Sequence, residues 1–312
     1  MFMDMHELCK ELRAEYRLEK GILGTAPDFD FAISKASNII CHIEQNAVRT
    51  ITINADEQRP LDEMYSYLTA VERLLVIIDG VFIPLTSISF PNEGDNREKL
   101  EALAEHIMVQ RLHYFESAKF LSYGADTFAD YWECLPFIDY LRWKSTMDDL
   151  GVLHQMFLYA SSHTNLTNDV MLAFLVELME GLEEYYRDEY EKFGKINPNP
   201  PKKKSLAYGV NAMIHCFGKA IFSEEIKKHE EAFVSALVNS RVNIMHIKRK
   251  QKEPFLDGKE STLYAIKMNY LYRWALLEYI GVPTEVFSEK VEKRIRRLNE
   301  WNSIMFHLLN RL

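Results

Sequence analysis

The stretch that decides the fold of the second half of the chain is Thr167–Lys192, TNDVMLAFLVELMEGLEEYYRDEYEK. Its apolar residues recur every three or four positions, which is the period of one face of an α-helix. The pattern predicts a long helix that buries one face against other helices. Met171, Phe174, Leu175, Leu178, Leu182 and Tyr185 form the apolar face, and Glu177, Glu180, Glu184, Asp188 and Glu191 form an acidic side.

The same periodicity continues after a proline- and lysine-rich stretch at 197–204, which is typical of a loop. It predicts further helices, which gives an all-helical bundle of about five helices in all. These further helices are expected at about 205–220, 223–248, 260–280 and 284–310.

The first half is more mixed. Short apolar or alternating stretches occur at 31–43 and 48–54, and Arg49–Ile53 predicts a strand. Val81–Phe90 is rich enough in β-branched residues to predict a second strand. Helical patterns are found at 61–78, which Asp79 and Gly80 would end, at 97–120, and over most of an aromatic-rich region up to about 162.

The expected fold class is therefore mainly α. A mixed α/β but mostly helical N-terminal domain would cover 1–164, and a helical-bundle domain would cover 165–312. The 312 residues are 47% hydrophobic and 27% charged, which is typical of a globular protein with a sizeable core. No apolar run approaches the roughly 20 residues that span a bilayer, and the first residues are acidic where a secretory signal would be basic. We expect a cytoplasmic protein that does not enter membranes.

The composition also limits the chemistry. Cys9, Cys41, Cys134 and Cys216 are far apart, which favours free thiols over disulfides or a zinc knuckle. Nucleotide-binding and hydrolase motifs are absent from the sequence, so no cofactor is predicted. His106 and His113 lie seven positions apart near Glu105 and Glu116 and could hold a metal, but ordinary surface residues explain this spacing better, and no metal is predicted.

The cations are concentrated although the net charge is −9. Between Arg241 and Lys252 there are five Lys or Arg residues and no Asp or Glu, which favours a focused anion site over a general nucleic-acid coat. In an RNA-binding protein, such a cluster would hold the RNA backbone. An ordinary solvated helix end, favoured by the helix dipole, is the alternative. The patch consists of Lys248, Arg249, Lys250 and Lys252.

Arg241 and His246 stand beside this patch, with Asn243 between them. Arginine can hold a phosphate through two parallel hydrogen bonds, and histidine can move protons near neutral pH. At about 100° per residue, the two side chains lie about 140° apart on a regular helix. A shared site would therefore need a distorted helix or two subunits. The alternative is that both are ordinary helix residues near a basic end.

This region resembles the HEPN superfamily, whose signature is R-x4-6-H near the end of one bundle helix. The match is Arg241-Val242-Asn243-Ile244-Met245-His246. Three other stretches are similar to the branch found in ApeA-like antiphage proteins, and the resemblance covers about 165–300. They are the helix with its glutamate at Phe174–Leu182, the gap at Gln251–Lys259, and the leucine-rich run ending in glycine within Leu271–Val282.

The resemblance implies a metal-independent endoribonuclease, acting as a homodimer in antiphage defence or as a toxin. Arg241 and His246 would be catalytic, with Asn243 in support, and RNA, including tRNA, would be the substrate. A phage-derived trigger or an antitoxin would control it, through an N-terminal half that senses or regulates. Many family members have a polar residue directly after the arginine, whereas this chain has Val242. The alternative is a catalytically inactive HEPN module that dimerises or binds a partner protein.

Overall fold

The computed structural model describes residues 7–17, 26–34, 38–46, 48–80, 83–115, 127–161, 166–187, 205–246, 254–256 and 258–301. The chain forms two compact units. The N-terminal unit comprises 1–149 and 280–282, and the C-terminal unit comprises 150–279 and 283–312. The predicted domain boundary at 164–165 lies outside the described residues.

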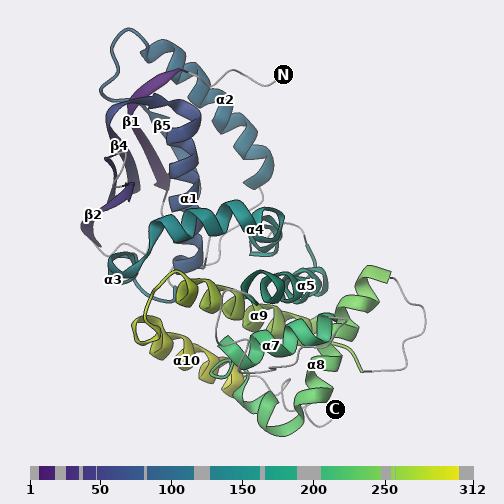
Figure 1. The fold of residues 1–312 in the computed structure, drawn as a ribbon. Helices are drawn as coiled ribbons and strands as arrows, with labels where there is room; N and C mark the ends of the chain where they lie inside the picture. The colour runs from purple at the N-terminus through teal and green to yellow at the C-terminus, as the bar shows by residue number, and fades with distance from the viewer. Residues whose placement is uncertain are drawn as a thin grey trace. The chain divides into compact units, whose positions relative to one another are not determined.

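The N-terminal unit contains a five-stranded sheet in which every neighbouring pair is antiparallel, with strand order β2-β3-β4-β1-β5 (Figure 1). The strand predicted at 49–53 is confirmed within β4, and the one predicted at 81–90 is confirmed over β5. The sequence did not predict β1. The bounds are β1 Leu8–Arg17, β2 Ala26–Ser34, β3 Ile39–Gln45, β4 Val48–Pro60 and β5 Leu85–Ser89.

The two faces of this sheet differ in polarity because successive side chains of a strand point to opposite sides. Leu12 and Ala14 of β1 are buried opposite Ile53 and Ile51 of β4. The other face is polar, as is common for an antiparallel sheet that packs against a core on one side only. Its polar residues are Asp28 and Asp30 on β2, His42 and Glu44 on β3, Thr50 and Thr52 on β4, Arg13 and Glu15 on β1, and Ser87 and Ser89 on β5.

The helix α1, Leu61–Asp79, packs against β1 and β4 and covers the apolar face. It confirms the helix predicted at 61–78, and it ends at Gly80, whose φ of 78° is a left-handed cap conformation that glycine adopts readily. Helix α2, Arg97–Phe115, contacts β5, and residues 116–120 of its predicted range lie outside the described residues. Two further helices follow, α3 at Tyr131–Cys134 and α4 at Tyr140–Ser161, the latter interrupted at Gly151.

A buried ion pair fastens the end of α1 to the sheet. Arg49 Nη1 donates to Asp79 Oδ2 at 2.5 Å, and both side chains are almost completely buried. Arg49 Nε also donates to Gln45 Oε1 at 2.8 Å, and the guanidinium lies 5.2 Å from the centre of the Tyr131 ring. Burial raises the pKa of Tyr131 to about 12, so its hydroxyl stays protonated in this core.

The C-terminal unit is helical, and α5 is its central element, in contact with α7, α8 and α9 (Figure 1). The predicted helices are confirmed in the described ranges. Thr167 begins α5 as a cap, its side-chain oxygen accepting a hydrogen bond from the Val170 amide. Within the described residues, every helix is too short or too polar to cross a bilayer. The bounds are α5 Asn168–Tyr186, α7 Leu206–Phe217, α8 Ser223–His246, α9 Gly258–Tyr279 and α10 Thr284–Trp301.

A second buried ion pair joins α8 to α9. Lys267 Nζ donates to Glu225 Oε1 at 2.5 Å, and both side chains are fully buried. The Tyr264 hydroxyl donates to the same carboxylate oxygen at 3.1 Å. Burial lowers the pKa of Lys267, and the Glu225 carboxylate acts in the opposite direction by stabilising the ammonium.

We expect Lys267→Met to destabilise the C-terminal unit by about 3–5 kcal/mol, because it leaves the Glu225 carboxylate buried without a cation. The double variant Lys267→Met, Glu225→Gln should recover most of this loss, since the amide oxygen can still accept from Tyr264. Urea unfolding of the two variants and the parent measures both effects. Equal stability of the single and double variants would show that the charge pair is not the cause.

Candidate functional site

The arginine of the HEPN-like motif contacts a glutamate of the central helix. Arg241 on α8 donates from Nε to Glu177 Oε2 on α5 at 2.5 Å. The arginine side chain is 20% exposed and that of the glutamate 31%, so the pair lies at the surface of the bundle. Within the described residues, the two terminal nitrogens of Arg241 donate no hydrogen bond. The described part of the chain thus leaves these two nitrogens available to an anion.

This arrangement suits an oxyanion with two or more oxygens. A guanidinium carries its donors in a planar fork, and a partner on Nε fixes the plane of that fork. The terminal nitrogens can then donate two parallel hydrogen bonds to a phosphate. The Glu177 contact therefore orients the arginine without occupying the nitrogens that would bind substrate.

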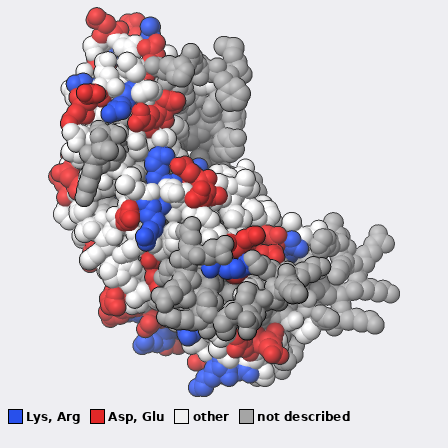
Figure 2. Space-filling model, in the orientation of Figure 1, with Lys and Arg blue, Asp and Glu red and all other residues white. Residues whose placement is uncertain are grey.

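Negative charge surrounds this arginine as well. Partial burial raises the pKa of Glu180, the nearby Glu177 raises it further, and Arg241 lowers it. Glu184 is one turn further along α5 and also raises the Glu180 pKa. The visible face of the molecule carries basic and acidic side chains interspersed (Figure 2). Among the described residues, the acidic side chains of α5 therefore oppose the binding of an anion at Arg241.

Helix α7 packs closely on α5, the helix that carries Glu177 and Glu180. A Cβ atom added to Gly209 of α7 would lie 2.7 Å from the Glu180 Cα, which is closer than real Cβ atoms approach. The Gly209 position thus allows the two backbones to approach each other closely. The sequence analysis did not identify this role.

Residues 254–256 lie against α8 at the turn that precedes Arg241. Ser240 Oγ donates to the Ala236 carbonyl at 2.7 Å and accepts from the Leu256 amide at 2.7 Å. Asn239 Nδ2 donates to the Pro254 carbonyl at 3.2 Å. These bonds hold residues 254–256 beside the Arg241 turn of α8. Small polar residues directly before the motif were the only sequence signal for this contact.

The other predicted site residues fall at the end of α8 or beyond it. Asn243 is half-buried and hydrogen-bonds to none of the described residues. His246 is the last residue of α8, and its side chain lies outside the described part of the chain. The one helical interruption within α8 is at His229, about three turns before Arg241. The predicted RNA-binding residues Lys248, Arg249, Lys250 and Lys252 also lie outside the described residues.

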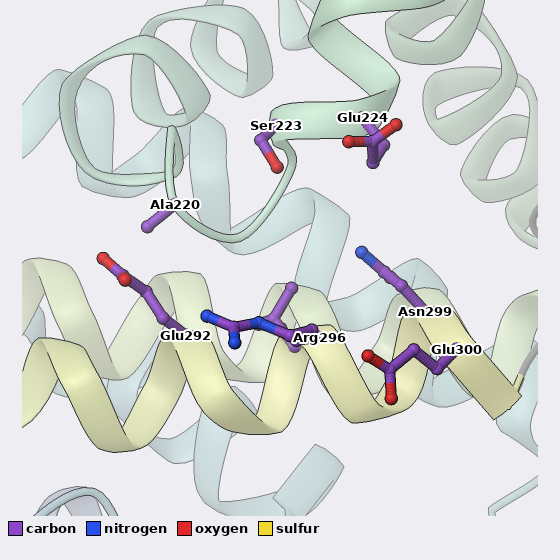
Figure 3. Close-up of a pocket in the computed structure, with 8 residues that line it drawn as sticks. Ala220, Ser223, Glu224, Glu292, Arg296, Asn299 and Glu300 are labelled. Carbon is purple, nitrogen blue, oxygen red and sulfur yellow. The ribbon is translucent and has the colours of Figure 1, made fainter.

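A hollow of about 660 Å³ lies at the other end of α8, between its first turn and α10 (Figure 3). Arg296 projects from α10 there, with Glu292 and Glu300 on the same helix. Glu224 adds a third carboxylate from α8. Three acidic groups around one arginine make this hollow a poor site for a polyanion.

Within the described residues, one group of side chains has the composition and spacing to hold a metal ion. It consists of Asp28, His42 and Glu44 on the polar face of the sheet. It belongs to the N-terminal unit, whereas Arg241 and Glu177 belong to the C-terminal unit. No metal site was predicted from the sequence, because these residues come from two strands whose pairing is not evident in it.

Comparison of the chain with protein-family models, with curated proteins and with solved structures finds no match. The resemblance to the HEPN superfamily therefore rests on the residues quoted for it.

We expect Gly209→Ala to destabilise the C-terminal unit by about 1–3 kcal/mol, since the new methyl group collides with the backbone of α5. Gly94→Ala is the matched control, because a Cβ atom at Gly94 meets nothing within 4 Å. Thermal unfolding followed by circular dichroism compares the two. A similar change in both variants would argue against close α5–α7 packing.

Proposed function

We propose that this chain is a metal-independent endoribonuclease of the HEPN type. The proposal rests on the hydrogen bonding of Arg241. Glu177 holds its Nε at 2.5 Å, while its terminal nitrogens donate no hydrogen bond within the described residues. An arginine fixed in this way is suited to stabilising the charge that develops on a phosphoryl group.

The proposed reaction is an internal transfer at phosphorus. His246 removes the proton of a ribose 2′-hydroxyl, and the 2′-oxygen attacks the adjacent phosphodiester. The bond between phosphorus and the 5′-oxygen breaks, and a protonated imidazole delivers a proton to that leaving oxygen. Arg241 neutralises the non-bridging oxygens during this step. The products are a 2′,3′-cyclic phosphate and a 5′-hydroxyl end, and DNA is spared because it lacks the nucleophile.

The proposed site is composite. On a regular helix Arg241 and His246 are about 140° apart, so one subunit does not direct both at one phosphate. In a homodimer, Arg241 of one protomer would act with the partner's His246. Asn243 would help to position the phosphate. Lys248, Arg249, Lys250 and Lys252 would bind the flanking RNA backbone, with tRNA as one candidate substrate.

The proposed biological role is antiphage defence by abortive infection, or action as a toxin, in the cytoplasm. Cutting RNA would stop growth of the infected or stressed cell. In this proposal the N-terminal unit senses a phage-derived trigger or receives an antitoxin. Such control would be needed, because an unrestrained ribonuclease would also harm a healthy host.

A second candidate is a catalytically inactive HEPN module that dimerises or binds a partner protein. The acidic residues of α5 favour it, because Glu177, Glu180 and Glu184 would repel an RNA backbone that approaches Arg241. In that case the ion pair between Arg241 and Glu177 would serve only to join α5 to α8. Val242, where many family members have a polar residue, points in the same direction.

We expect the purified full chain to cleave tRNA or total RNA in the presence of EDTA. Arg241→Ala and His246→Ala should each lower the rate by about 10²-fold or more, because each removes a group that acts on the reacting phosphate. Glu177→Ala should slow cleavage less, since the arginine keeps its charge and loses only its orientation. Gel electrophoresis gives the rates, and mass spectrometry identifies the cyclic phosphate ends.

The control is Arg97→Ala, which removes an exposed arginine paired with Glu101 in the N-terminal unit and should leave the rate unchanged. Light scattering establishes the oligomeric state of every variant. Cleavage that requires a divalent metal would contradict the proposed chemistry. A wild-type protein that dimerises but cuts no RNA would favour the interaction module.

A further inference from the structure

Four potential metal-binding side chains gather on the polar face of the sheet, at its β2–β3 pair. Asp28 and Asp30 come from β2, and His42 and Glu44 come from β3. Asp30 is the direct cross-strand neighbour of His42. Because alternate residues of a strand share a face, both residues of each pair point away from the apolar core.

The His42 imidazole lies between the carboxylates of Asp30 and Glu44. His42 Nδ1 lies 2.6 Å from Asp30 Oδ1, and its Nε2 lies 3.1 Å from Glu44 Oε1. The ligand atoms of Asp28, His42 and Glu44 all lie within 4.8 Å of one another. The His42 side chain is 28% exposed and that of Glu44 is 40% exposed, so an ion can enter from solvent.

The hydrogen bonds that the His42 ring can make indicate what can bind between its Nε2 and Glu44. A neutral imidazole has one N–H, and donation from Nδ1 to Asp30 leaves a lone pair on Nε2. In that state the lone pair faces Glu44 Oε1, and a metal ion can take the place of the proton that a charged ring would donate to this carboxylate. In a tetrahedral zinc site, ligand atoms 2.0–2.1 Å from the metal are separated by about 3.4 Å. The observed 3.1 Å between Nε2 and Oε1 is close to that separation.

We propose that Asp28, His42 and Glu44 form a Zn²⁺ site. The ligands would be His42 Nε2 and one carboxylate oxygen each from Asp28 and Glu44, with water in the fourth position. Asp30 would be a positioning residue, because its bond to Nδ1 fixes the ring and its tautomer as carboxylates do behind zinc-binding histidines. The ion would join β2 to β3 across their pairing.

The donor set favours zinc over the common hard cations. Mg²⁺ and Ca²⁺ prefer sites made of oxygen alone, whereas imidazole suits Zn²⁺. Cysteine does not enter the site, because Cys41 of β3 is buried on the opposite, apolar face. Closing the three ligand atoms around one ion requires side-chain movements of roughly 1 to 1.5 Å, which these partly exposed residues can make.

The test is titration calorimetry with ZnCl₂ on the full-length protein, after chelation and removal of the chelator. We expect one Zn²⁺ to bind at this site in the wild type. His42→Ala should abolish that binding, and Asp28→Asn and Glu44→Gln should weaken it at least about tenfold, while Asp30→Asn should weaken it about tenfold. Circular dichroism verifies that each variant is folded, which is expected because the changes are on the solvent-facing side of the sheet.

Two controls separate this site from adventitious binding. Glu15→Gln removes a carboxylate from the same face of the sheet, on β1. His215→Ala removes a histidine that contacts Glu230 in the C-terminal unit. Both should bind zinc as the wild type does. Binding that is absent in the wild type, or equal in wild type and His42→Ala, would overturn the proposal.

Cobalt substitution supplies a readout of geometry. Co²⁺ at this site should give visible absorption of the strength typical of four-coordinate nitrogen and oxygen ligation, and His42→Ala should lose it. A sulfur-to-cobalt charge-transfer band would place the ion at a cysteine instead, and would also overturn the assignment.

Discussion

Burial of a charged side chain costs free energy unless an opposite charge pairs with it. Each unit contains a buried ion pair of this kind that joins two of its elements. In the N-terminal unit, Arg49 reaches Asp79 and thereby fastens the end of α1 to the sheet. In the C-terminal unit, Lys267 and Glu225 join α9 to α8. Arg241 and Glu177 also form an ion pair, but both side chains are only partly buried, so the free-energy cost of removing them from water is smaller. Among the described residues, Arg241 pairs with Glu177 through Nε alone, which leaves its two terminal nitrogens for another acceptor.

The sequence was sufficient for the helices because an apolar stripe of period 3.6 is visible in one segment alone. It predicted α1 and the start of α5 to within one residue, whereas residues 188–192 of the range predicted for α5 lie outside the described residues. The strand β1 was harder to predict. Its alternation is broken by a bulge between Cys9 and Glu11, and several of its outward residues are charged. The inward residues of β1 can be recognised as core residues only once β1 is paired with β4, whose apolar side chains lie beside them.

The two candidate sites show the same difference between features that a local pattern reveals and features that depend on distant contacts. Arg241 was identified from a motif within α8, but nothing local indicates that Glu177, 64 positions earlier, is its partner. The cluster around His42 was also not predicted from sequence. Its members come from two strands, and it is their pairing register that brings Asp30 opposite His42. Contacts between distant segments are decided by packing, and a single sequence contains little information about them.

The outermost strands of the sheet have a further consequence. β2 carries Pro27, which cannot donate to a neighbouring strand, and its pairing with β3 is irregular at two places. β5, on the other side, has only five residues. Short, bulged or proline-containing edge strands are a common protection against intermolecular sheet extension and aggregation. Both edges of the described sheet thus oppose the addition of a strand from another molecule.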